Sequence, residues 1–75
     1  MKYTVVYIKG TEEYARDTYM SGATISDIVK ELRYEINRYG KDCDYITIFD
    51  ANNEEDIVYF KVVNIHGHYV LVKLV

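Results

Sequence analysis

The sequence predicts a small α+β domain in which one helix packs on a largely antiparallel sheet of four to five strands. Short segments rich in β-branched and aromatic residues lie on both sides of one segment whose apolar residues recur at helical spacing. The 75 residues are 49% apolar and 28% charged, with 4 Gly and no Pro, a composition that excludes disorder and low complexity. Residues 1–75 are therefore expected to form a single domain, with the element order β-β-α-β-β-β.

The first two strands are expected to form a hairpin. Residues 2–9 (KYTVVYIK) have the composition of a strand, and Gly10-Thr11 offers a turn. Residues 12–20 alternate imperfectly, so a second strand competes with a short helix capped by Thr11. We favour the strand.

The helix is expected to begin after Thr24 and to end at Gly40. Asp27 follows Thr24 at the spacing of a capping box, and its charge suits the positive end of the helix dipole. One face is apolar, comprising Ile25, Ile28, Val29, Leu32, Ile36 and Tyr39. The opposite face should be solvated and carries Lys30, Glu31, Arg33, Asn37 and Arg38.

Three strands are expected to follow, at residues 45–49, 57–65 and 69–75. An acidic loop at Asp50 to Asp56 should join the first two, and a His66-Gly67 turn the last two. A hairpin, a helix opening with TISDIVKEL and further strands are also similar in order to ubiquitin-like β-grasp domains. That arrangement is the alternative topology, although the sequence has no motif specific to the family.

Strand alternation predicts two faces of the sheet. The face under the helix should contain Val6, Ile8, Ile46, Ile48, Val58, Phe60, Val62, Val70, Val72 and Leu74. The outer face should contain Tyr3, Val5, Tyr7, Tyr45, Thr47, Phe49, Tyr59, Lys61, Val63, Tyr69, Leu71 and Lys73. Since nothing else in the sequence is left to cover this apolar, Tyr-rich side, we expect it to be an interaction site.

The expected function is a non-catalytic protein-interaction module that binds another protein or a second copy of itself. The sheet residues expected to contact the partner are Tyr3, Tyr7, Tyr45, Tyr59, Lys61, Tyr69 and Lys73, and those of the acidic loop are Asp50, Glu54, Glu55 and Asp56. The alternative is a single-stranded nucleic-acid binder in which Tyr rings stack on bases and Lys contacts phosphates. A third possibility is that the nine tyrosines have no binding role and are present because Tyr favours β-strands.

The charge distribution suggests a narrower version of the interaction hypothesis. Net charge is −3, which disfavours general phosphate neutralisation, and residues 42–56 contain six acids without Lys or Arg. This segment could mimic phosphate charge toward a basic, nucleic-acid-handling host factor. The protein would then be a small inhibitor or accessory protein of a phage or mobile element.

No motif predicts catalysis, a cofactor or a metal, and we expect that the protein is not an enzyme. Asp50 to Lys61 begins like a calcium-binding loop but has Glu55 where the turn needs Gly and Lys61 where a bidentate Glu is needed. Cys43 lies between two acids that disfavour its thiolate, and His66 with His68 offers too few ligands for zinc.

We expect the protein to be located in the cytoplasm and to have no membrane partner. The longest apolar runs are about four residues, against about 20 for a spanning helix. No secretory signal is recognised near the N-terminus, and one Cys cannot form an internal disulfide.

Overall fold

The computed structural model describes residues 2–19, 23–40, 43–50 and 52–74, with all side chains in these ranges except those of residues 14, 19 and 53–56. The elements are β1 (Tyr3–Lys9), β2 (Glu12–Tyr19), α1 (Ile25–Tyr39), β3 (Tyr45–Asp50), β4 (Asn53–Ile65) and β5 (His68–Lys73). The α+β fold and the element order predicted from the sequence are thus confirmed, and residues 12–19 form a strand.

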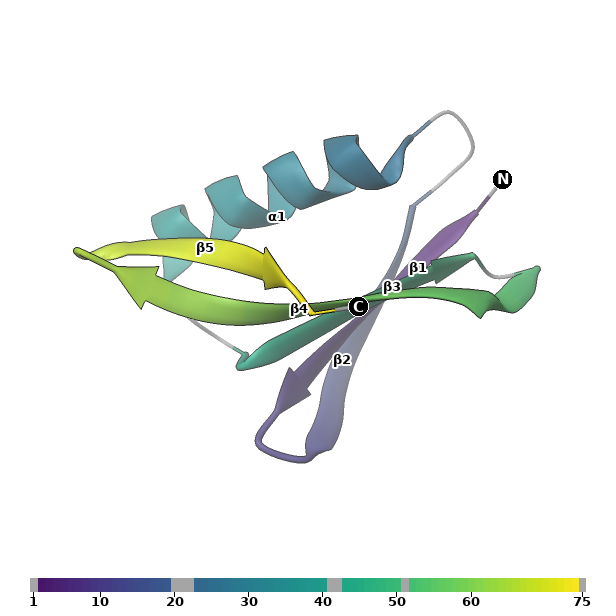
Figure 1. Ribbon diagram of the computed structural model, residues 1–75, viewed down its shortest axis with the longest axis horizontal. Helices are drawn as coiled ribbons and strands as arrows, with labels where there is room; N and C mark the ends of the chain where they lie inside the picture. The colour runs from purple at the N-terminus through teal and green to yellow at the C-terminus, as the bar shows by residue number, and fades with distance from the viewer. Residues whose placement is uncertain (1, 20–22, 41–42, 51, 75) are drawn as a thin grey trace.

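The five strands form one sheet in the order β2-β1-β3-β4-β5, and every neighbouring pair is antiparallel. Figure 1 shows α1 lying along one side of this sheet, next to β5, while the sheet twists so that β2 and β4 run in clearly different directions. Because α1 lies toward the β5 side, it leaves β2 at the other edge of the sheet without a helix above it (Figure 1).

The ends of α1 follow from its sequence. Thr24 Oγ1 accepts the N–H of Asp27 at 3.1 Å, and the N–H of Thr24 donates to Asp27 Oδ2 at 3.2 Å, which completes the predicted capping box. At the other end Gly40 has φ of 95° and donates its N–H to Ile36 O at 2.9 Å. Such a φ is readily adopted only by glycine, so Gly40 ends the helix as predicted.

The core lies between α1 and the sheet. The helix contributes Ile28, Leu32 and Ile36, which are all buried, and the sheet contributes Val5, Ile46, Ile48, Phe60 and Val62. Tyr39 was predicted to belong to the same apolar helix face but is 71% exposed, because it lies at a cavity between the helix and the β1–β2 hairpin.

The predicted faces are right for β3 and β4 and wrong for β1 and β5. In β1 the core side carries Tyr3, Val5 and Tyr7 rather than Val6 and Ile8. In β5 it carries Tyr69 and Leu71 rather than Val70 and Val72. Cross-strand pairing explains the difference, because Val5 lies opposite Ile48 and Leu71 lies opposite Val62, and directly opposed residues share a face.

The two turns of the β3-β4-β5 meander differ in their agreement with the sequence. The His66-Gly67 turn is confirmed: both residues have positive φ, 51° and 87°, as a two-residue hairpin requires. The predicted acidic loop Asp50–Asp56 is wrong, because β3 reaches Asp50 and β4 already begins at Asn53. Asp50 Oδ1 accepts the N–H of Asn52 at 2.9 Å, so the side chain of Asp50 pairs with a backbone donor of a compact turn.

Candidate functional site

The face of the sheet opposite α1 has no covering element in the described part of the chain, and we call it the open face. Its residues follow from the strand pairing and from alternation with the core positions. They are Glu13, Arg16 and Thr18 on β2; Thr4, Val6 and Ile8 on β1; Tyr45, Thr47 and Phe49 on β3; Ile57, Tyr59, Lys61, Val63 and Ile65 on β4; and His68, Val70 and Val72 on β5.

One row of side chains crosses four strands of the open face. Arg16 lies opposite Val6, Val6 opposite Thr47, and Thr47 opposite Tyr59. Val6 and Thr47, in the middle of this row, are only 8% and 7% exposed. The centre of the open face is therefore screened from water by its own neighbouring side chains, as in the middle of a protein interface.

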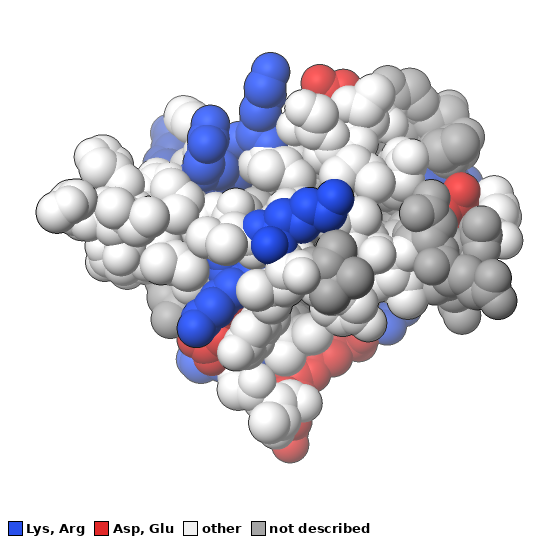
Figure 2. Space-filling view, in the orientation of Figure 1, with Lys and Arg blue, Asp and Glu red and all other residues white. Residues whose placement is uncertain are grey.

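Larger apolar side chains surround this centre and remain exposed. Tyr45 and Tyr59 are 36% and 40% exposed, and toward β5 Val72 and Ile65 are 42% and 49% exposed. Figure 2 shows the β4–β5 hairpin, at the left of the view, without Lys, Arg, Asp or Glu at its tip, and acidic side chains toward the β1–β2 end at the bottom. An exposed apolar area of this kind is typical of a contact surface.

A shallow depression of about 270 Å³ lies on the open face, lined by Arg16, Thr47, Phe49, Ile57 and Tyr59. The Oγ1 atom of Thr47 is buried there and has no hydrogen-bond partner among the described residues. A buried hydroxyl without a partner is costly, by about 1–3 kcal/mol. Thr47 therefore carries a desolvated polar group at the base of the depression.

The described charged side chains on the open face are the basic Arg16 and Lys61 and the acidic Glu13, which lies opposite Ile8. Arg16 donates through Nη2 to Glu13 Oε1 three residues earlier on β2, so its charge is partly compensated. Lys61, opposite Tyr45, is exposed. A partner of the open face therefore meets an apolar surface with one uncompensated basic side chain among the described residues.

Several residues predicted on the outer face lie instead on the helix side. Tyr3, Tyr7 and Tyr69 pack against the core, and the hydroxyl of Tyr7 donates to Asp17 Oδ2 at 2.9 Å. Lys73 lies opposite Phe60, which places it on the same side. Of the predicted sheet contacts, Tyr45, Tyr59 and Lys61 are on the open face. Val6, Ile8, Val70 and Val72 are also on this face but were predicted to face the helix.

The predicted acidic contacts are divided between a turn and a strand. Asp50 supports the turn before β4, as described above. The backbone of Glu54, Glu55 and Asp56 belongs to β4, where the pairing with β3 shifts from Phe49–Ile57 to Asp50–Asn53. Their side chains, with Asp42 and Ala51 of the acidic segment, lie outside the described residues. Asp44 is described, and its Oδ2 accepts the N–H of Gly10 at 2.9 Å.

The remaining reactive side chains are placed as follows. Cys43 is 3% exposed and packs in the core, whereas His66 and His68 are exposed at the β4–β5 turn. Among the described residues, no three His, Cys, Asp or Glu side chains are grouped so that they could hold a metal ion. Within the same residues, no helix has the length and apolar character needed to span a membrane.

Comparison of the chain with protein-family models, with curated proteins and with solved structures gave no match.

Proposed function

We propose that the protein is a non-catalytic interaction module that binds another protein through the open face. The observation that supports this most strongly is the row Val6–Thr47–Tyr59, where two buried residues are flanked by exposed tyrosines on a sheet face that no described element covers. Tyrosine is among the side chains that most often act as interface hot spots, and Tyr59 and Tyr45 are exposed on this face.

The aromatic residues supply the affinity in this proposal. Tyr45 and Tyr59 lie on adjacent strands, and each still exposes more than a third of its surface. Tyrosine rings bury a large area with little loss of conformational freedom, and their hydroxyl groups remain able to form hydrogen bonds. A partner that covers both rings also shields Val72 and Ile65 on the same face.

The chemistry of the open face specifies the kind of partner. It should present aliphatic or aromatic side chains to Tyr45 and Tyr59 and a carboxylate near Lys61. The narrower hypothesis of an acidic mimic of nucleic acid has less support, since Asp44 and Asp50 accept backbone N–H groups within the fold.

Single-stranded nucleic acid is a second candidate ligand for the same surface. Tyr45, Phe49 and Tyr59 share the open face with the basic side chains Arg16 and Lys61, so rings for base stacking and cations for phosphates are adjacent. This combination is weaker than the sequence predicted, because Tyr3, Tyr7, Tyr69 and Lys73 lie on the other side of the sheet.

The test compares Tyr59→Glu with Tyr34→Glu, which makes the same chemical change at a 60% exposed tyrosine on α1. Proteins captured on the immobilised chain after nuclease treatment are identified, purified and titrated by calorimetry, and the mass of the chain alone is measured by light scattering. We expect Tyr59→Glu to weaken the reconstituted complex by roughly 30-fold or more, the loss typical of a hot spot. Tyr34→Glu should bind like the parent chain.

Two results would contradict the proposal. One is a folded Tyr59→Glu variant that binds the purified partner with unchanged affinity. The other is a monomeric chain that binds no protein but binds a labelled single-stranded oligonucleotide, with an affinity that falls steeply with salt and is lost in Lys61→Ala. That result would support the nucleic-acid candidate instead.

A further inference from the structure

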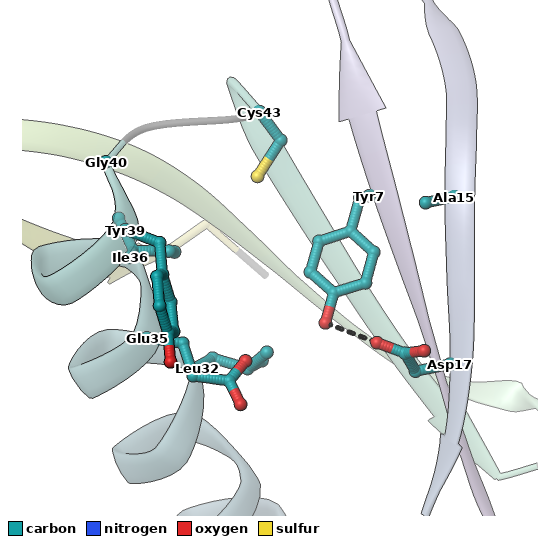
Figure 3. A pocket seen from close by; sticks show the side chains of 9 residues that line it. All are labelled: Tyr7, Ala15, Asp17, Leu32, Glu35, Ile36, Tyr39, Gly40 and Cys43. Atoms are coloured by element: carbon teal, nitrogen blue, oxygen red, sulfur yellow. Dashed lines mark hydrogen bonds between the residues drawn. The ribbon is translucent and has the colours of Figure 1, made fainter.

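The helix side of the sheet carries a groove separate from the open face. Because α1 leaves β2 uncovered, a cavity of about 280 Å³ opens between the C-terminal half of α1 and the β1–β2 hairpin. Its lining includes Leu32, Ile36 and Cys43, which belong to the buried core. Figure 3 shows Tyr7 and Asp17 on the strand side of this groove, facing Glu35 and Tyr39 on the helix side.

All charged residues that line the groove are acidic. Its two charged side chains are Asp17 on β2 and Glu35 on α1, on opposite walls. The hydroxyl of Tyr7 donates to Asp17 Oδ2 at 2.9 Å, which fixes that carboxylate at the groove (Figure 3). Glu35 is half-buried, and neither carboxylate forms an ion pair with a described cation. The groove therefore attracts a positive charge.

The other walls are apolar and aromatic. Tyr7 and Tyr39 provide rings, and Leu32 and Ile36 provide an aliphatic floor. On its own helix, Arg38 lies over the ring of Tyr39, 5.4 Å from the centroid, and donates to Tyr34 Oη at 2.8 Å. The guanidinium group of Arg38 is thus already held outside the groove, where it supports the ring of Tyr39.

We propose that this groove binds an arginine side chain presented by a partner protein. The aliphatic part of arginine would pack on Leu32 and Ile36, and its planar guanidinium group would lie between the tyrosine rings and donate to Asp17 and Glu35. A volume of about 280 Å³ is at the lower limit for ligand pockets, which suits one side chain better than a larger molecule.

The groove favours arginine within a polypeptide over the free amino acid. Free arginine carries a carboxylate, and the lining of the groove contains two carboxylates and no cation to receive it. An arginine inside a chain has no charge at its backbone, so it avoids this repulsion.

The probe for the test is N-acetyl-arginine N-methylamide, titrated into the ¹⁵N-labelled protein and followed by amide chemical shifts. The matched neutral probe is N-acetyl-citrulline N-methylamide, which has nearly the same shape without the charge. We expect saturable shifts at Tyr7, Ala15, Asp17, Glu35 and Cys43 with the arginine probe, and much smaller shifts with citrulline and with free arginine. The amide of Tyr59 on the open face should not move, which separates this test from that of the proposed function.

The variants Asp17→Asn and Glu35→Gln should each weaken the probe by roughly threefold or more, the order expected for partly exposed ion pairs. The control is Glu31→Gln, an exposed carboxylate on the same helix that does not line the groove. Equal binding of the citrulline probe, an equal effect of Glu31→Gln, or no saturable shifts would each overturn the proposal. Tighter binding of the corresponding lysine derivative would show that the groove selects an ammonium instead.

Discussion

Asn37 on α1 holds the backbone of Tyr69 on β5 with both atoms of its side-chain amide. Nδ2 donates to Tyr69 O and Oδ1 accepts from Tyr69 N, each at 2.8 Å. The same Nδ2 also donates to Arg33 O at 2.8 Å, so both N–H donors of the amide are used. Because β5 is an edge strand, the helix satisfies main-chain groups that no strand pairs with, and thereby fixes where α1 sits on the sheet.

Replacing Asn37 with Ala should therefore lower the free energy of unfolding by about 1–2 kcal/mol, since two backbone groups of Tyr69 lose their partners. Urea unfolding measures this loss, and hydrogen exchange should show reduced protection of the Tyr69 amide. Lys30→Ala, at an exposed position of the same helix, is the control and should change stability by less than about 0.5 kcal/mol. Similar losses in both variants would mean that the contact contributes nothing specific.

Replacing Leu32 with Ala should cost about 2–5 kcal/mol, because Leu32 is 1% exposed and its loss leaves a cavity between α1 and the sheet. Such a cost is a large fraction of the roughly 4–11 kcal/mol of stability expected for a chain of this size. Denaturant melts of Leu32→Ala and of the conservative Leu32→Met should differ clearly. A neutral Leu32→Ala would show that the helix packs by another face.

Thr47 provides a test of the buried hydroxyl. Thr47→Val keeps the shape of the side chain and removes an unpaired Oγ1, so the free energy of unfolding should stay the same or rise, by up to about 1 kcal/mol. The reverse change at the neighbouring position, Val6→Thr, should destabilise by about 1–3 kcal/mol because it buries a new hydroxyl. Destabilisation by Thr47→Val would indicate that Oγ1 has a partner within the free protein.

The capping box of α1 predicts a specific dependence of stability on pH. The pKa of Asp27 lies below its usual value of 3.8. The main cause is hydrogen bonding with the side chain of Thr24, and hydrogen bonding with the backbone of Thr24 contributes less. A carboxyl group whose pKa is lower in the folded state contributes stability above its unfolded pKa, and this contribution disappears as the pH falls through the folded pKa. Asp27→Asn should therefore lose less stability than the parent chain between pH 6 and pH 2.

Thermal melts across this range measure the effect, with Glu31→Gln as a control for removing one exposed carboxylate from the same helix. If Asp27→Asn and the parent chain lose stability equally on acidification, the capping bonds do not favour the charged form of Asp27.

The sequence determines the elements of this fold better than it determines which way they face. The helix is predictable because Thr24, Asp27 and Gly40 mark its ends and one stripe is clearly apolar. The sequence predicts which side of β3 faces the helix, because the polar Thr47 alternates with the apolar Ile46 and Ile48. In β1 both alternating sets are apolar, Tyr3-Val5-Tyr7 and Val6-Ile8, so composition gives no preference and a shift of one residue exchanges the faces.

The candidate site inherits this ambiguity. In β5 the aliphatic residues Val70 and Val72 suggested a core face, yet they lie on the open face, because Asn37 and the pairing with Val62 place Tyr69 and Leu71 under the helix. Asn37 itself was predicted on the solvated side of α1, and a polar residue in a helix gives no local signal of a backbone contact 32 residues away. The residues 53–56 illustrate a third limit, since a run of acids reads as a loop although its backbone joins β4.

The order of strands also has a consequence for how the chain folds. The β1–β2 hairpin and the β3-β4-β5 meander are each built from neighbouring segments, and β1 pairing with β3 is the contact that unites them across the whole of α1. Closing that long loop loses chain entropy before the packing of the core can offset the loss. This step should therefore limit the folding rate. Substitutions in the shared β1–β3 seam, such as Val5→Ala, should then slow folding, whereas Gly67→Ala at the distant turn should mainly speed unfolding.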